Sequence, residues 1–284
     1  MKHQAHGHHH DARIHPIHVG WSGLTDCGPF RSNNEDAFLA LAFDSQTVRR
    51  LRKTGSATLA DEDCVFAVSD GMGGAHSGEF ASRISVDQVT RLLPRGFRRT
   101  AGGTKQGYVE ILAEIVAAIH RDLTLMGRSY PECAGMGATL SLGWFTPGWM
   151  YFSHIGDSRI YHVPSGGPMS QLTSDHTHVG WLRRTGKINE REARTHPRRN
   201  ALQQVLGAGA QFAEAQFGAV PCLPGDRFLF CTDGVVDGLW DRRIEEVLLS
   251  PIAIGDLAGK LVREAIENSG RDNATAVAVE ISHG

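Results

Sequence analysis

The stretch Val65-Phe66-Ala67-Val68-Ser69-Asp70-Gly71 joins an apolar, strand-like run to an acidic dipeptide. The same combination recurs at three distant places, beside Asp157-Ser158, Asp233-Gly234 and Asp272-Asn273. Short runs of this composition, bounded by turn residues, are typical of β-strands. Because the ends of strands in a rigid sheet can present side chains to a common point, the four aspartates are candidates for one shared site.

Carboxylates that meet at one point repel one another. Two of them about 4 Å apart repel by roughly 4 kcal/mol at an effective dielectric constant of 20, so a cluster of them requires protons or cations. A ligand set made only of oxygen suits the hard ions Mg2+ and Mn2+ better than zinc. The simpler interpretation of any single Asp-Gly pair is a turn at the end of a strand.

A further segment places a cation and two adjacent carboxylates, Arg31, Glu35 and Asp36, before an apolar run over 38–43. With this segment the chain carries seven motifs in order. They are Arg31 with Glu35-Asp36-Ala37, Ser69-Asp70-Gly71-Met72-Gly73-Gly74, Gly137-Ala138-Thr139, Ile155-Gly156-Asp157-Ser158-Arg159-Ile160-Tyr161, Leu172-Thr173-Ser174-Asp175-His176-Thr177, Thr232-Asp233-Gly234 and Gly270-Arg271-Asp272-Asn273-Ala274-Thr275. In the content and order of these motifs the chain resembles the metal-dependent PPM (type 2C-like) serine/threonine protein phosphatases of bacteria, over residues 19–281.

The resemblance implies a centre of two Mn2+ or Mg2+ ions. Asp70 is expected to bridge the two ions, with the carbonyl of Gly71 on the second ion and with Asp233 and Asp272 completing the shell of the first. A pair of such ions can generate hydroxide near neutral pH and neutralise phosphoryl oxygens. The slow hydrolysis of phosphate esters requires both effects.

Three residues of the first motif are expected to serve the same centre. Glu35 and Asp36 should lie on the side of the second ion, directly or through water, and with unequal roles because neighbours on a strand point to opposite faces. Arg31 is the expected phosphate clamp, since a planar guanidinium matches two phosphoryl oxygens; the alternative is a surface salt bridge. Met72 stands where eukaryotic relatives carry a proposed general acid, a histidine, so protonation of the leaving group is left unassigned.

A third metal position is implied by Asp157, whose counterpart in bacterial relatives binds such an ion, and by Asp237, four residues after Asp233. The alternative is that Asp157 only holds its turn. The charged segment 175–206 is similar to the mobile flap of those relatives, and its arginines could also meet phosphopeptide. These arginines are Arg183, Arg184, Arg191, Arg194, Arg198 and Arg199.

The length of 284 residues and the 41% hydrophobic content fit one catalytic domain over 18–284, with a flap subdomain at 175–206 and a disordered histidine-rich tail at 1–17. Periodicity alone indicates a layered α/β or α+β protein. The resemblance implies the α+β class, as a four-layer α-β-β-α sandwich with two central antiparallel sheets flanked by helices.

Individual elements follow from local patterns. Apolar residues at three- and four-residue spacing predict a long helix over 108–123, and a second helix over 78–93 is expected to end at Pro94. Helices are also expected near 241–249 and 256–267, with a hairpin through Pro147-Gly148. The polar segment 45–63 is expected to be an extended loop or a long hairpin tip.

Composition restricts the cellular context. A net charge of -2 provides no steering field for nucleic acid or an anionic membrane. There is no uninterrupted apolar stretch of about 18 residues and no apolar core of a signal peptide. The five cysteines include no Cys-x-x-Cys pair, which favours reduced thiols; we treat all five as packing residues. We therefore expect a cytoplasmic monomer.

The predicted function is hydrolysis of phosphoserine and phosphothreonine in proteins by metal-activated water, reversing bacterial serine/threonine kinase signalling. The expected partners are phosphorylated proteins, namely such a kinase and its substrates. A catalytically impaired PPM-like adaptor is the alternative, but it would have lost metal carboxylates. A two-metal nuclease is disfavoured by the lack of basic clusters outside 175–206, and a zinc hydrolase by the absence of His-Glu-x-x-His.

Overall fold

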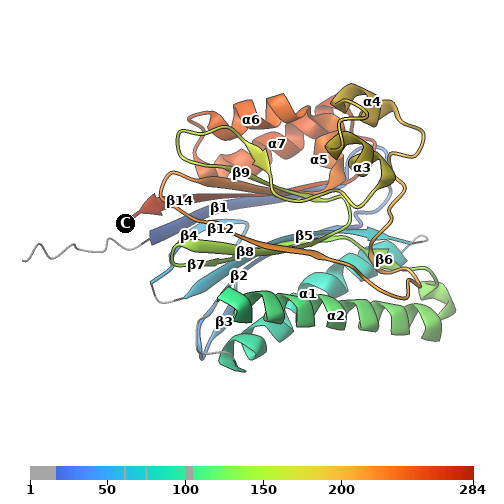
Figure 1. The fold of residues 1–284 in the computed structure, drawn as a ribbon, viewed down its shortest axis with the longest axis horizontal. Helices are drawn as coiled ribbons and strands as arrows, with labels where there is room; N and C mark the ends of the chain where they lie inside the picture. The colour runs from blue at the N-terminus through green and yellow to red at the C-terminus, as the bar shows by residue number, and fades with distance from the viewer. Residues whose placement is uncertain (1–16, 61, 74–75, 100–104) are drawn as a thin grey trace, which may run out of the picture.

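The computed structural model describes residues 17–60, 62–73, 76–99 and 105–284. The predicted tail at 1–17 lies, apart from its last residue, outside the described residues. Two antiparallel sheets form the centre of the molecule and helices cover both outer faces, so the predicted α-β-β-α sandwich is confirmed (Figure 1). Three apolar layers hold it together, one between the sheets and one under each set of helices.

The first sheet has the strand order β10-β9-β13-β14-β1-β4. Its strands are β1 (Ile17–Asp26), β4 (Thr54–Thr58), β9 (Arg159–Val163), β10 (Ser170–Gln171), β13 (Arg227–Cys231) and β14 (Ala274–His283). On its outer face pack α5 (Asp233–Gly238), α6 (Asp241–Leu249) and α7 (Ile254–Asn268). The expected helices near 241–249 and 256–267 are therefore confirmed.

The second sheet has the order β11-β6-β5-β7-β8-β12, with β2 on β5 and β3 on β2. Its strands are β2 (Asp36–Phe43), β3 (Val48–Arg50), β5 (Asp63–Met72), β6 (Gly137–Ala138), β7 (Leu140–Thr146), β8 (Trp149–Ile155), β11 (Leu206–Gly207) and β12 (Gln216–Pro221). Its outer face is covered by α1 (Ser77–Arg99) and α2 (Lys105–Ser129), and the short helix η1 (Pro131–Cys133) follows. The predicted long helix is confirmed by the buried stripe of α2, which includes Leu112, Ile115 and Ile119.

Aromatic side chains fill the layer between the sheets. Phe145 of β7 packs edge-on against Phe66 of β5 and against Phe228 and Phe230 of β13. Side chains of this size bury large apolar areas, and edge-to-face pairs add about 0.5–1.5 kcal/mol each. The two sheets are therefore fixed face to face, which also fixes their ends relative to one another.

Two expectations about local structure are wrong. Pro94 does not end its helix, because α1 continues to Arg99 with Pro94 inside it. The missing N–H of the proline removes one helical hydrogen bond, but the helix stays packed on the second sheet. The segment 45–63 is neither an extended loop nor only a hairpin tip: β3 pairs with β2 as in a hairpin, but β4 pairs with β1 as an edge strand of the first sheet.

The remaining outcomes concern the cysteines and membranes. All five cysteines are free, as expected, but Cys27 does more than pack, because its Sγ donates to the carbonyl of Arg31 over 3.3 Å. Among the helices that the structure describes, none is long and apolar enough to cross a bilayer.

Outside both sheets, α3 (His178–Arg184) and α4 (Glu190–Thr195) occupy the segment predicted as a flap.

Candidate active site

The predicted carboxylates come from strand ends of both sheets. Asp70 lies near the C-terminal end of β5, where it is paired across the ladder with Asp36, the first residue of β2. Asp233 begins α5 directly after β13, and Asp272 precedes β14, which pairs antiparallel with β13. Asp157 follows β8 at the crossing into β9. Packing of the two sheets therefore brings residues up to about 240 positions apart into one cluster.

Burial and mutual repulsion dominate the electrostatics of this cluster. Burial, reinforced by the carboxylates of Asp36 and Asp233, raises the pKa of Asp70 well above its usual value. Burial and the charge of Asp157 do the same for Asp233. The pKa of Asp36 rises to about 7, mainly through burial. Such a cluster is stable near neutral pH only when protons or cations compensate its charge.

The chemistry of these donors fits a hard divalent cation, since all of them are oxygen atoms. At Gly71 the backbone also leaves no room for a side chain, because a Cβ there would lie 1.9 Å from the carbonyl oxygen of Gly78. The Gly71 N–H donates to the Glu35 carbonyl over 3.1 Å, which holds these two candidate ligands side by side. Within the part of the chain that the structure describes, however, no three His, Cys, Asp or Glu side chains form a preassembled metal-binding group. The ligand assignments therefore remain predictions.

Arg31 approaches the cluster from the surface. Its Nη2 donates to Oδ2 of Asp272 over 2.8 Å, and its Nε donates to the carbonyl of Arg271 over 3.3 Å. Its side chain remains 46% exposed. The structure thus shows the salt bridge that was the alternative to a phosphate clamp, but the partner is a candidate metal ligand and the guanidinium is partly open to solvent.

Glu35 and Asp36 have different surroundings. The carboxylate of Asp36 is buried and accepts a hydrogen bond from the hydroxyl of Thr232 over 2.7 Å, across the interface between the sheets. Glu35 is half-buried and carries a pKa raised by burial. Glu35 is therefore the more available ligand of the two, and Asp36 is held in place by the opposite sheet.

Asn273 is a residue of the site that the sequence interpretation missed. Its side chain is buried; its Oδ1 accepts from the N–H of Glu35 over 2.8 Å, and its Nδ2 donates to the carbonyls of Cys27 and Asn33 over 2.9 and 3.0 Å. One amide thereby ties the loop that carries Arg31 and Glu35 to the strand that carries Asp272. The available signal was its place in the Asp-Asn pair before β14.

Thr139 is a second missed residue. Its hydroxyl accepts from the N–H of Asp70 over 2.9 Å and lies 2.7 Å from the hydroxyl of Ser158, the neighbour of Asp157. The side chains of Thr139 and Ser158 are both buried. Thr139 thus links the backbone of Asp70 to Ser158, the neighbour of the second candidate carboxylate, Asp157.

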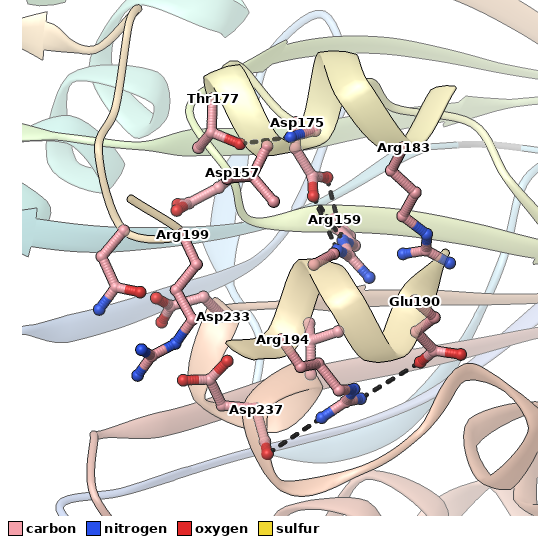
Figure 2. A pocket seen from close by; sticks show the side chains of 15 residues that line it. Asp157, Arg159, Asp175, Thr177, Arg183, Glu190, Arg194, Arg199, Asp233 and Asp237 are labelled. Atoms are coloured by element: carbon pink, nitrogen blue, oxygen red, sulfur yellow. Dashed lines mark hydrogen bonds and ion pairs between the residues drawn. The ribbon is translucent and has the colours of Figure 1, made fainter. Parts of the chain in front are cut away.

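A cavity of about 70 Å³ lies between the helices α3 and α4 and the start of α5. Asp157, Asp233 and Asp237 all line it, and Figure 2 shows them around it together with Arg199 of the flap segment. Burial raises the pKa of Asp157 to about 7, with the charge of Asp175 acting in the same direction. The predicted third position is therefore a place where acidic side chains meet, one helical turn along α5 from Asp233.

The flap segment is bound to this cavity by arginines. Arg159 pairs with Asp175 over 2.7 Å in a buried ion pair, and Arg183 pairs with Asp241. Arg194 of α4 donates to the carbonyl of Asp237 (Figure 2). It also donates to the carbonyl of Leu239, directly after α5. Its guanidinium also lies 4.2 Å from the centre of the Trp240 ring. The segment is therefore docked on α5 and α6 rather than fully solvated.

Comparisons with known proteins agree with this geometry. The family model for protein phosphatase 2C matches residues 53–254. The serine/threonine phosphatase stp of Listeria innocua is 30% identical over 257 residues, which cover 90% of this chain and 93% of that protein. The serine/threonine protein phosphatase PstP of Mycobacterium tuberculosis is 30% identical over 92% of this chain, which spans only 45% of that longer protein.

Solved structures show the same fold. The crystal structure of the Mycobacterium tuberculosis phosphatase PstP/Ppp superposes with a TM-score of 0.75 at 29% identity, covering 94% of this chain and all of that one. A structure of the PstP catalytic domain in complex with two manganese ions gives a TM-score of 0.72 at 26% identity, with 94% of this chain and 99% of that chain covered.

Proposed function

Because the chain belongs to the protein phosphatase 2C family, we propose that it is a metal-dependent protein serine/threonine phosphatase. It would hydrolyse phosphoserine and phosphothreonine without a covalent enzyme intermediate. The observation that supports this most directly is that Asp70 and Asp233, half-buried at the strand ends of different sheets, have pKa values raised well above normal by desolvation and by neighbouring carboxylates. Bound Mn2+ or Mg2+ would activate water and neutralise phosphoryl charge at this place.

The proposed ligands of the ions are the residues that the family resemblance implies and that lie at the strand ends. Asp70, Asp233 and Asp272 would hold the first ion, and Asp70 with Glu35 and the Gly71 carbonyl would hold the second. Asp36 would support these ligands without displacing them, since its hydrogen bond to Thr232 holds its buried carboxylate in place. Asp157 and Asp237 would hold a third ion in the cavity beside α5.

Arg31 would bind and orient the phosphate. Its exposed guanidinium can turn from Asp272 to two phosphoryl oxygens, because the fork of donors that now meets one carboxylate matches the phosphate equally well. The loop that carries Arg31 is held by Asn273. A clamp supported in this way orders the substrate before the chemical step.

The wider assignment is also proposed. Residues 18–284 would form one catalytic domain with 175–206 as its flap subdomain. The partners would be phosphorylated proteins, among them a serine/threonine kinase and its substrates in a bacterial cytoplasm; the related Listeria and Mycobacterium proteins are named serine/threonine phosphatases. A catalytically impaired adaptor is less consistent with the site, because each of the expected carboxylates is present.

The test is turnover of a phosphothreonine peptide. We expect activity that a chelator abolishes and added Mn2+ restores, and that Asp233→Asn loses while its circular dichroism spectrum stays that of the parent. Full activity in the chelated protein or in the Asp233→Asn variant would overturn the proposal.

A further inference from the structure

A second pocket, of about 300 Å³, lies next to the carboxylate cluster. It is lined by Arg194, Thr195, Arg199, Asp237, Ser269 and Arg271. Asp237, Arg194 and Arg199 also border the smaller cavity of the site, so the two spaces adjoin (Figure 2). The pocket therefore opens from the end of α4 and the end of α7 toward the candidate metal ligands.

The charges around this pocket are unbalanced. Three arginines line it against one aspartate, although the whole chain has a net charge of -2. Arg194 is already engaged with Glu190 and with the carbonyls at the end of α5. For Arg199 and Arg271, no ion-pair partner exists within the ranges that the structure describes, so both guanidinium groups are available to an anion.

The pocket lies within reach of the phosphate site. The Nε of Arg31, the proposed phosphate clamp, donates to the backbone carbonyl of Arg271 over 3.3 Å. An extended peptide advances about 3.3 Å per residue. Side chains within about three residues of a phosphorylated residue held by Arg31 can therefore reach Arg271 and, across the pocket, Arg199.

We propose that this pocket binds an acidic side chain of the phosphoprotein substrate, so that the enzyme prefers phosphoserine or phosphothreonine flanked by Glu or Asp. The inference rests on the proposed function and adds the substrate class. Guanidinium groups suit this role, because they present several donors to a carboxylate in fixed geometry. Thr195 and Ser269 offer hydroxyls for the same ligand.

The experiment compares phosphothreonine peptides that differ only by Glu or Gln at one position, scanned over three residues on each side. At the best position we expect kcat/KM to be about fivefold higher for the Glu peptide, as for one partly exposed ion pair, and the advantage to shrink with added salt. In the double variant Arg199→Ala/Arg271→Ala the ratio should fall to about one. Arg242→Ala, an exposed arginine of α6 outside both the flap and the pocket, is the matched control and should keep the parent ratio.

A charge reversal protects the test against loss of folding. Arg271→Glu should prefer a Lys peptide over the Glu peptide, which a misfolded protein cannot do. The proposal would be overturned if the parent protein had equal kcat/KM for the Glu and Gln peptides. It would also be overturned if the preference for Glu survived both arginine substitutions.

Failure of the pocket can be told from failure of the proposed function. If both peptides are hydrolysed equally, the phosphatase assignment stands and the pocket does not. If neither peptide is hydrolysed, binding of the same labelled peptides is measured by fluorescence anisotropy. Tighter binding of the Glu peptide that is lost in the double variant would still support the pocket. Equal binding of the Glu and Gln peptides would reject it.

Discussion

Arg31 and Asp272 form an ion pair with 2.8 Å between Nη2 and Oδ2, and the two residues are proposed to bind opposite kinds of ligand. Asp272 is expected to hold a cation, whereas Arg31 is expected to hold the phosphate. A cation at Asp272 would compete with the guanidinium for the same oxygen. If these assignments hold, metal binding and the release of Arg31 toward phosphate would be coupled through this one contact.

Replacement of Arg31 should separate these two effects. In Arg31→Ala we expect the KM of a phosphothreonine peptide and the inhibition constant of inorganic phosphate to rise about tenfold, as for a lost charge-assisted hydrogen bond, with a smaller effect on kcat. Binding of Mn2+ in the absence of phosphate should become tighter, because the competitor for Asp272 is gone. Calorimetry and steady-state kinetics measure both, with Arg242→Ala as the exposed control. Unchanged phosphate inhibition would contradict the clamp.

The buried charge of Asp70 predicts a stability crossover. At pH 7.5 and with chelator, Asp70→Asn should unfold at a higher temperature than the parent, by about 2–4 °C for each kcal/mol of repulsion removed. With excess Mn2+ the parent should gain stability by mass action and the variant should gain much less. Differential scanning calorimetry under both conditions checks this. If Mn2+ stabilised the two proteins equally, Asp70 would not be a metal ligand.

The third ion can be tested apart from the first two. We expect Asp157→Ala to retain two metal ions per chain by calorimetry or anomalous scattering, yet to lose most turnover at limiting Mn2+. The reason is that Asp157 borders the cavity under the flap segment together with Asp237. Asp237→Asn should behave in the same way. If the Asp157 variant binds as many ions as the parent and is equally active across a Mn2+ titration, Asp157 is only a turn residue.

Asn273 should act as a positioning residue. Asn273→Ala removes the hydrogen bonds of a buried amide to Glu35, Cys27 and Asn33 and leaves backbone groups of the 27–35 loop unpaired. We expect the free energy of unfolding to fall by about 1–3 kcal/mol. We also expect a raised KM and weaker Mn2+ binding under conditions where the variant is fully folded. The control is Asn268→Ala, which removes an exposed amide that donates to the carbonyl of Gly238. A loss of stability with unchanged KM and metal affinity would make the role purely structural.

Asp63 gives a pH prediction away from the metal site. Burial raises its pKa to about 6, and the indole of Trp144 donates to it over 2.8 Å. Since the folded pKa exceeds the unfolded value, the stabilising contribution of Asp63 is complete below about pH 4 and is lost as pH rises through about 6. Asp63→Asn, which can keep the Trp144 bond, should therefore be more stable than the parent by about 3 kcal/mol at pH 8 and not at pH 4. Urea titrations across this pH range measure the difference in the free energy of unfolding. A gain in stability that did not depend on pH would show that the raised pKa of Asp63 is not its cause.

Local patterns predicted much of the scaffold. The apolar stripe of α2 follows from residue spacing alone, and the β7–β8 turn follows from Gly148, which adopts a positive φ of 82°. The residue types of the site were also visible, because carboxylates beside strand ends are a feature of the chain itself. Propensity failed at Pro94 and in β4, where packing on a sheet and pairing with β1 outweighed the local preference.

The sequence by itself therefore determined the elements, their order and the chemistry available at their ends. Only the tertiary structure decided which side chains meet: Asn273 with Glu35 across 238 positions, Arg31 with Asp272 across 241, and Thr232 with Asp36 across 196. The physical reason is that helix and strand periodicity depends on neighbours a few residues away. Partners from different sheets are set by how the two apolar faces pack, and a single chain carries no local signal of that fit.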